Sequence, residues 1–296
     1  VLRDGSTIET LDKKTDDISM HRIIKSMVGR ELTNLYPPRD SNIGDIVFEV
    51  RDWSVYHPNF SDIEILHKVN INVRKGEVLG IAGLMGSGRT ELAMSIFGKS
   101  YGQKITGELY KDGKRIVINN PTQAINAGIA YVSEDRHEYG LINGMSIKDN
   151  VSLTSLKKFI KNYSIDVDKE IMKVNEYKDK LSIKCRDIEQ KVDELSGGNQ
   201  QKVIFSRWLL ADADILILDE PTRGIDVGSK YEIYEIINHL VSMGKSVIFI
   251  SSDMPELIGM CDRVFVLAEG YVVGELQKND ISQENIMKAI MEGAKK

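Results

Sequence analysis

Short apolar runs and amphipathic stretches follow one another along most of this chain. Apolar runs at 47–55, 69–73, 78–82, 129–132, 215–218, 246–251 and 263–267 predict strands. The run at 78–82 leads into a glycine-rich turn, which is typical of a buried strand that feeds a helix. Alternating charges at 229–243 predict a helix between two of the later strands. Strands that alternate with helices favour an α/β fold with a mainly parallel sheet.

A long interval separates the first predicted strands from the later ones. Residues 146–210 are mostly helical in pattern and contain many Lys, Asp and Glu. We therefore expect a helical subdomain at about 135–210. The polar stretch at 36–42, which contains two prolines, has the composition of a linker. One domain is thus expected over 41–296, after a separate segment at 1–40.

The two ends of the chain are similar to each other. Residues 1–5 match 266–270, and residues 23–27 match 286–290, with a gap of two residues between the copies. This repeat predicts that 1–40 is the tail of a preceding copy plus a linker, with a strand pair within 1–11 and a helix over 19–28. The first residue is Val rather than Met, which is expected of a fragment of a longer protein. Chance similarity between two strand-turn-strand-helix units is the alternative.

Composition narrows the class of protein. A chain of 296 residues with 42% hydrophobic and 28% charged residues is ordinary for a globular protein. The net charge of −5 disfavours a general nucleic-acid binder, so no nucleic acid is expected as a partner. No apolar run approaches the ~18 residues of a membrane-spanning helix, and no signal peptide is visible. The isolated Cys185 and Cys261 lack metal-ligand spacing and are expected to be reduced thiols.

A candidate phosphate-binding loop follows the strand at 78–82. It fits the pattern G-x-x-x-x-G-K-[S/T], except that Arg89 replaces the lysine. Glycines let backbone N–H groups turn toward phosphate oxygens, and the helix that begins near Arg89 adds the positive end of its dipole. Arginine keeps the charge but is planar and bulkier than an ammonium group. The predicted binding residues are Gly83, Leu84, Met85, Gly86, Ser87, Gly88, Arg89, Thr90 and Glu91.

Two acidic residues end the apolar strand at 215–218. Asp219 is placed to hold Mg²⁺ together with the Thr90 hydroxyl. Glu220 comes next and is suited to act as the general base that orients an attacking water. A strand that ends in solvated acids is the plainer interpretation, but the phosphate-binding loop upstream favours a nucleotide site.

A second glycine-containing stretch precedes this strand. With residues 215–222, it resembles the signature motif and Walker B strand of ABC-type ATPases. The resemblance implies ATP and Mg²⁺ as ligands, and it implies a pair of cassettes, because this family's signature motif contacts nucleotide held by a partner. Ser196 is expected to cap the helix that follows and to face a γ-phosphate across the interface. The residues of this stretch are Leu195, Ser196, Gly197, Gly198, Asn199 and Gln200.

From about 47 to 293 the chain resembles the second ATP-binding cassette of bacterial monosaccharide importers of the ribose, galactose and xylose type. Residues 83–92, 131–136, 195–202, 220–228 and 251–257 carry the resemblance, and 28–32 is similar to the family's segment between cassettes. It implies a mainly parallel sheet core, an antiparallel β subdomain and a helical subdomain. It also implies a peripheral place at the cytoplasmic face of the membrane. The implied partners are a first cassette of the same polypeptide, membrane permease subunits and, indirectly, a periplasmic or extracellular sugar-binding protein.

Three positions depart from the general ABC pattern. Arg89 replaces lysine, Glu134 stands where glutamine is usual, and Ser252 stands where a histidine senses the γ-phosphate. All three fall in one composite site, whereas 195–200 is intact. We predict Glu220, Glu134 and Ser252 as the catalytic positions of a weak site. Tyr56 and His57 are candidates to stack on adenine, with simple surface exposure as the alternative.

Other functions remain open from the sequence. A nucleoside importer would share many of these sequence motifs, as would an ATP-driven exporter or a regulatory cassette that binds nucleotide without hydrolysis. A soluble ABC-type ATPase that acts on DNA or ribosomes would predict a long coiled-coil insert or strongly basic arms, and neither is present. Cargo identity belongs to the permease and the binding protein, so this chain does not specify it.

Overall fold

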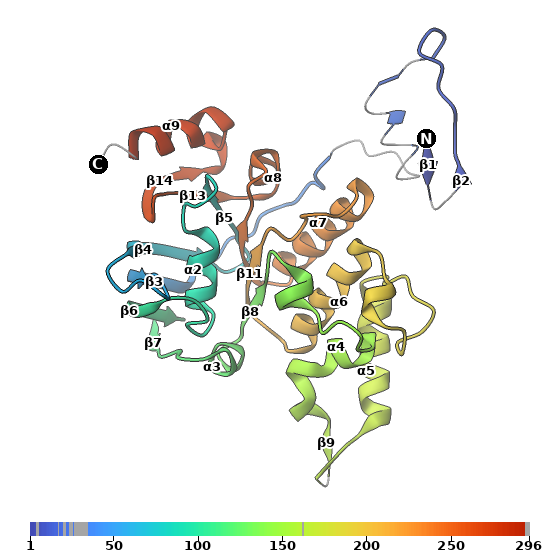
Figure 1. Ribbon diagram of the computed structural model, residues 1–296, viewed down its shortest axis with the longest axis horizontal. Helices are drawn as coiled ribbons and strands as arrows, with labels where there is room; N and C mark the ends of the chain where they lie inside the picture. Colours follow the sequence, from blue (N-terminus) through green and yellow to red (C-terminus); the bar gives the residue numbers. More distant parts are fainter. Residues whose placement is uncertain are drawn as a thin grey trace.

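The computed structural model describes residues 1–3, 6–16, 18–19, 22–23, 26, 35–161 and 163–293 (Figure 1). Its central sheet has six strands in the order β14-β13-β5-β12-β11-β8. All neighbouring pairs are parallel except β13 and β14, which pair antiparallel. The mainly parallel α/β core is therefore confirmed. The strands are β5 (Val78–Gly83), β8 (Ile129–Val132), β11 (Ile215–Asp219), β12 (Ser246–Ile250), β13 (Arg263–Ala268) and β14 (Tyr271–Gln277).

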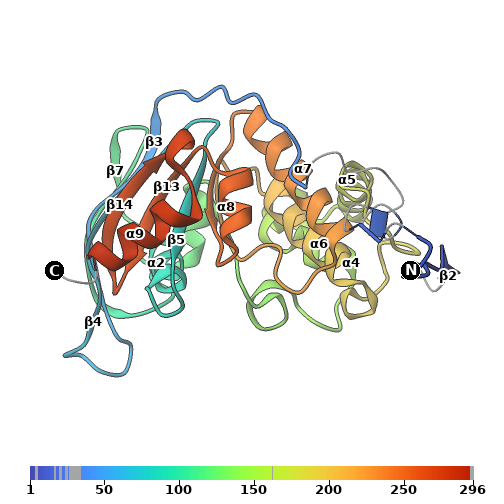
Figure 2. The same cartoon turned by 90° about the horizontal axis from the view of Figure 1, so that it is seen from above.

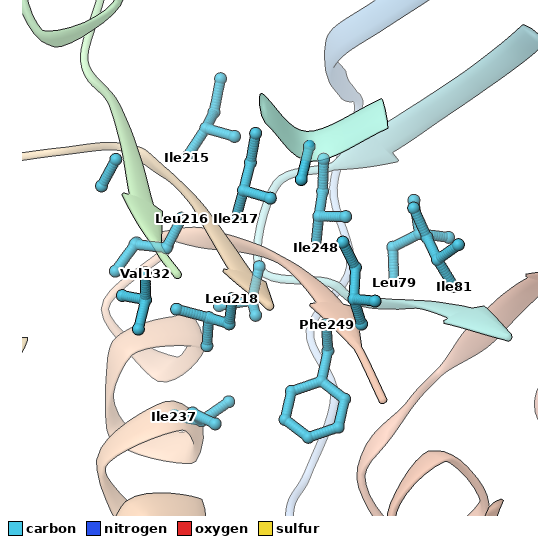
Figure 3. Close-up of a cluster of buried hydrophobic side chains, with 14 of the residues drawn as sticks. Leu79, Ile81, Val132, Ile215, Leu216, Ile217, Leu218, Ile237, Ile248 and Phe249 are labelled. Atoms are coloured by element: carbon cyan, nitrogen blue, oxygen red, sulfur yellow. The ribbon is translucent and has the colours of Figure 1, made fainter. Parts of the chain in front are cut away.

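Helices cover the central sheet and bury it. Every residue of β11, β12 and β13 is buried, as expected of parallel strands with helices on their faces. Figure 3 shows Ile217 and Ile248 on one face and Phe249 on the other, on the same side as Ile237 of α7. The helices around this core are α2 (Arg89–Ile96), α3 (Pro121–Asn126), α7 (Val227–Ser242), α8 (Met254–Met260) and α9 (Gln283–Gly293).

A second sheet is antiparallel, with the strand order β4-β3-β6-β7. Burial alternates along β4, where Leu66, Val69, Ile71 and Val73 point inward, as in a sheet with one packed face. Figure 1 shows this sheet at one end of the molecule. The antiparallel β part expected from the resemblance is confirmed. Its strands are β3 (Ile46–Tyr56), β4 (Glu64–Arg74), β6 (Gln103–Lys111) and β7 (Lys114–Ile116).

Between β8 and β11 the described chain is mostly helical. The buried Arg207 holds this part together, since its guanidinium donates to the Asn150 carbonyl at 2.6 Å and to the Gly140 carbonyl at 2.5 Å. Burial lowers the pKa of Arg207 to about 10. A short hairpin that the pattern did not predict joins η2 to α5. The elements are η1 (Arg136–Gly140), α4 (Ile147–Ser152), η2 (Leu153–Phe159), β9 (Ile160–Lys161), β10 (Ser164–Ile165), α5 (Val167–Lys180), η3 (Val192–Glu194) and α6 (Gly197–Leu210).

The N-terminal strands form a small sheet of their own. β1 (Leu2–Arg3) pairs antiparallel with β2 (Ser6–Thr7), so the strand pair expected within 1–11 is confirmed. The helix predicted over 19–28 lies largely outside the described residues, and segment 28–32 lies wholly outside them. The division at residue 40 and the origin of 1–40 in a preceding copy stay predictions. Within the described part of the chain, each helix is too short or too polar to cross a bilayer.

Candidate functional site

The glycine loop joins the carboxyl end of β5 to α2. Gly86 and Gly88 have φ values of 79° and 99°, in the region that favours glycine. A Cβ on Gly86 would meet no atom within 4 Å, so there is free space beside the backbone here. Gly88 occupies the N-cap of α2 without a side-chain cap, which leaves the first N–H groups of the helix available. The loop therefore fits the phosphates of a nucleotide.

The turn between β13 and β14 is hydrogen-bonded to this loop. The Gly270 N–H donates to the Ser87 carbonyl at 3.0 Å, and the Gly270 carbonyl accepts from the His67 N–H at 3.0 Å. A Cβ on Gly270 would lie 1.9 Å from the Ile65 carbonyl oxygen. The sequence pattern did not single out Gly270, although its glycine ends the repeated unit at 266–270.

Asp219 ends β11 as a completely buried carboxylate. Tyr131 donates to its Oδ2 at 3.2 Å, while Oδ1 is buried and has no hydrogen-bond partner. Burial raises the pKa of Asp219 to about 6, although hydrogen bonds from Thr90 and Tyr131 oppose that rise. An unpartnered buried carboxylate oxygen beside a threonine hydroxyl is a donor set that suits Mg²⁺.

Protein groups alone do not complete a metal site in the described part of the chain. Among the described residues, no group of three or more His, Cys, Asp or Glu side chains is arranged so that it could hold a metal ion. Mg²⁺ in nucleotide sites commonly takes one or two protein ligands and completes its shell with phosphate oxygens and water. Asp219 and Thr90 therefore fit a cation that arrives with a nucleotide, and this assignment stays a prediction.

The structure brings together Arg89, Glu220 and Ser252, which are three of the positions that the sequence assigns to the weak site. Arg89 Nη1 donates to the Ser251 carbonyl at 2.7 Å and lies 3.7 Å from Glu220 Oε1. The Ser252 N–H donates to the same oxygen of Glu220 at 2.6 Å. Burial raises the pKa of Glu220, while the contacts with Ser252 and Arg89 counteract the rise. Arg89 thus contacts the predicted base, a pairing that the sequence did not predict.

Glu134 has a different partner. Its carboxylate forms an ion pair with Arg223, three residues after Glu220. Arg136 donates to Gln200 Oε1 at 3.0 Å and to the Arg223 carbonyl at 3.0 Å. These two arginines connect the helical part to the loop after β11. Sequence reasoning missed both, although Arg136 and Arg223 lie within the stretches that carry the resemblance.

The expectation that the Ser196 hydroxyl caps α6 is wrong. Ser196 does occupy the N-cap position, but it makes no side-chain hydrogen bond to the first turn. Its Oγ instead accepts from Asn199 Nδ2 at 2.9 Å, because that amide competes for the hydroxyl. Ser196 is exposed, so the start of the helix can meet a group from outside the chain.

The other residues of the signature stretch fix this helix in place. Gln200 is buried and donates to the Val192 carbonyl at 3.1 Å. A Cβ on Gly198 would lie 2.2 Å from Ser229 Oγ, so a glycine allows α6 to approach α7. Leu195 is buried and Gly197 is half-buried. Among the described residues, no hydrogen bond or ion pair links 195–199 to Arg89, Thr90 or Glu220, as expected if the two groups serve different nucleotides.

Tyr56 and His57 remain unassigned. Both are half-buried. The Tyr56 hydroxyl lies 3.4 Å from Glu64 Oε2, and Lys104 Nζ lies 5.5 Å from its ring centroid. The His57 ring packs on Phe60 at 4.8 Å. These contacts leave the choice between adenine stacking and surface packing open.

Comparison with known proteins identifies relatives of this chain. A profile of the family described as ABC transporter matches residues 66–223. The L-arabinose transport ATP-binding protein AraG of Geobacillus stearothermophilus is 52% identical over 99% of this chain and 58% of its own length. The xylose import ATP-binding protein XylG of Thermoanaerobacter pseudethanolicus is 49% identical over 97% of this chain and 56% of its own length. The chain spans about half the length of these curated relatives.

A solved structure supports the fold. The ADP conformation of an ATP-binding cassette from an ABC transporter matches with a TM-score of 0.68. The match covers 85% of this chain and 99% of the other chain, at 20% sequence identity. At that identity the similarity concerns the fold alone, and this fold is the one that the sequence resemblance implied.

Proposed function

This chain belongs to the ABC transporter family of ATP-binding proteins, and we propose that it couples ATP binding and hydrolysis to the import of a monosaccharide through a membrane permease. The observation that carries the nucleotide part is the open glycine loop beside the unpartnered buried Oδ1 of Asp219. The names of the arabinose and xylose relatives support the sugar part. A nucleoside importer and a cassette that only binds nucleotide are the alternatives.

The chain acts, in this proposal, as the second of two cassettes in one polypeptide. The repeated ends support it: residues 1–5 match 266–270, and both copies form antiparallel strand pairs. The paired cassettes would dock on permease subunits at the cytoplasmic face of the membrane and receive sugar indirectly from an external binding protein. Expression of the full-length protein with the permease and sugar-uptake measurements would test this assembly, and uptake that needs neither ATP nor this chain would contradict it.

The residues of the chain divide the work as follows. Bound Mg²⁺-ATP would supply the phosphoanhydride bond to be cleaved. The N–H groups of the glycine loop orient phosphates, and Thr90 and Asp219 are the residues that would hold the cation. Glu220 would accept the proton of the attacking water. Its Oε1, however, already accepts the Ser252 N–H and faces Arg89. Because those contacts stabilise the ionised carboxylate and so make it a weaker base, we expect weak hydrolysis at this site.

The isolated chain is therefore expected to turn over ATP more slowly than about 1 per second, the lower end of ordinary enzyme rates. Phosphate release at saturating Mg²⁺-ATP would measure it, with the chain alone and with its upstream cassette added. Activity that appears only with the upstream cassette would support a catalytic pair. Turnover of the isolated chain above that rate would contradict the weak site, and no turnover in either case would favour the regulatory alternative.

A further inference from the structure

Glu256 of α8 is a buried carboxylate to which the proposed mechanism gives no role. Its side chain is 1% exposed, yet it accepts hydrogen bonds from four side chains. Burial alone would raise the pKa of Glu256, but the Lys230 ammonium and the hydroxyl donors hold it below its usual value. The carboxylate is thus ionised, and both of its oxygens accept hydrogen bonds. The four donors are Thr222 Oγ1 at 2.5 Å, Lys230 Nζ at 2.7 Å, Tyr234 Oη at 2.7 Å and Ser251 Oγ at 2.8 Å.

Two of these donors belong to the loops of the candidate site. Thr222 follows Glu220 by two residues, in the loop after β11. Ser251 follows β12, and its carbonyl accepts from Arg89. The next N–H, that of Ser252, donates to Glu220. One buried carboxylate therefore fixes both loops at the place where Arg89 and Glu220 meet.

A third donor connects Glu256 to the linker (36–42). The Tyr234 hydroxyl donates to Glu256, and the Tyr234 ring packs against the Tyr36 ring with centroids 5.3 Å apart. Tyr36 also covers Gly259 of α8, where a Cβ would lie 2.3 Å from the tyrosine ring. Tyr36 therefore rests on both helices that surround the carboxylate.

The linker is itself anchored. Arg39 Nη2 donates to Asp262 Oδ2 at 2.6 Å, and that oxygen also accepts the Val78 N–H at the start of β5. Asn238 of α7 donates to the Pro37 carbonyl at 3.1 Å. Figure 2 shows the chain running past α7 and over the molecule to β3. A displacement of the preceding polypeptide would act on these contacts first.

We propose that Tyr36, Tyr234 and Glu256 form a relay through which the linker sets the position of the two loops that hold Arg89 and Glu220. Glu256 is the positioning residue of this relay. The inference rests on the proposed function in one respect, that a nucleotide binds at the glycine loop with its terminal phosphate toward these two loops. The relay would let the polypeptide before the linker control how firmly this cassette holds a triphosphate.

The relay predicts a selective effect on nucleotide binding. The glycine loop and the start of α2 make no hydrogen bond with Glu256, Tyr234 or Tyr36 among the described residues, so a diphosphate keeps its contacts when the relay is broken. The two loops, in contrast, lose their common anchor. General loosening of the fold would weaken both nucleotides alike, so the ratio of ATP to ADP affinity distinguishes positioning from mere stability.

The test uses three variants of the chain: Glu256→Gln, Tyr234→Phe and Tyr36→Ala. Titration with Mg²⁺-ATP and Mg²⁺-ADP gives both affinities, and thermal melting confirms folding. Glu256→Gln is expected to weaken ATP binding about tenfold and Tyr234→Phe about fivefold, the usual range for a lost charge-assisted or neutral hydrogen bond. Tyr36→Ala should weaken it roughly threefold, as for a residue that acts through others. ADP affinity should change less than about twofold in each case.

Tyr163→Ala is the matched control, because Tyr163 is fully exposed on the hairpin of the helical part. It should leave both affinities unchanged. Tyr36→Ala combined with Glu256→Gln should be no worse than Glu256→Gln alone, since the two act in series. If Glu256→Gln fails to fold, Tyr234→Phe and Tyr36→Ala decide the question.

Several results would overturn the relay. Equal losses of ATP and ADP affinity would assign these residues to stability alone, and an unchanged ratio in Tyr234→Phe and Tyr36→Ala would show that the linker does not reach the site. A parent chain that binds both nucleotides while its variants behave like the control overturns the relay only. A parent chain that binds neither nucleotide overturns the proposed function, and the relay with it.

Discussion

Ser196→Arg in the full-length protein is expected to abolish transport almost completely, whereas Glu220→Gln is expected to cost much less. Ser196 is exposed at the start of α6, where its hydroxyl accepts from Asn199. An arginine there would place bulk and a misdirected charge against nucleotide held by the first cassette. Glu220 instead faces Arg89 in the weak site. The two transport rates should differ at least ~10-fold, about 1.4 kcal/mol of barrier.

Sugar uptake into vesicles with the complete transporter measures this contrast. Ser61→Arg is the matched control, because Ser61 is exposed in the loop before β4 and, among the described residues, makes no hydrogen bond with 195–199, Arg89 or Glu220. It should transport like the parent. Equal, severe losses for Ser196→Arg and Glu220→Gln would mean that both sites hydrolyse ATP, and the asymmetric interpretation would then fail.

Gly270→Ala is expected to destabilise the chain strongly and to weaken nucleotide binding. Gly270 has φ +81°, and an added Cβ would lie 1.9 Å from the Ile65 carbonyl oxygen, which is backbone and cannot rotate away. The combined cost of that overlap and the left-handed backbone is on the order of 3 kcal/mol. For a chain of this size the melting temperature would fall by roughly 5 °C. Because Gly270 also donates to the Ser87 carbonyl, the shift would distort the glycine loop.

Gly113→Ala separates the cost of the steric overlap from the cost of the left-handed backbone. Gly113 also has a left-handed backbone, with φ +71°, but a Cβ there would meet nothing within 4 Å. It lies in the turn between β6 and β7, so only the backbone penalty of about 1 kcal/mol applies. Melting curves and nucleotide titrations of both variants provide the measurement. Equal shifts in melting temperature would show that the contact with Ile65 does not matter.

The apolar runs predicted the central sheet well because its strands are buried on both faces. Residues 78–82, 215–218 and 263–267 needed no context to be identified, and β5, β11 and β13 lie there. The antiparallel sheet was harder. β4 begins at Glu64, five residues before the apolar run at 69–73. The pattern missed this first part because the polar Glu64, His67 and Lys68 leave only Ile65 and Leu66 as apolar positions. β6 and β7 gave no run at all.

The sequence predicted which residues belong to the candidate site, but it did not predict the contacts between them. The sequence motifs placed Arg89, Glu134, Glu220 and Ser252 in one site. The structure brings Arg89, Glu220 and Ser252 together, whereas Glu134 pairs with Arg223. That Arg89 would turn toward the Ser251 carbonyl depends on the fold, since the two are far apart in sequence. The Ser196 cap failed because the choice between a backbone N–H and the Asn199 amide is decided by local geometry.

Glu256 lay beyond sequence reasoning for a related reason. A glutamate in a short amphipathic helix usually faces water. Its burial follows only once α7 and α8 and the loops after β11 and β12 converge on one point. No pattern within the helix itself indicates that convergence.

The buried Arg207 ties η1 and α4 to α6, so we expect these three helices to move as one body. Its guanidinium binds carbonyl oxygens of Gly140 and Asn150, so η1 and α4 cannot leave α6 without stranding a buried charge. We therefore expect this body to bend relative to the central sheet at the two crossings, 133–135 and 211–214. Amide hydrogens of α4 and α6 should consequently exchange with solvent as one cooperative unit. A crosslink across either crossing would therefore restrict the motion of η1, α4 and α6 together rather than that of a single helix.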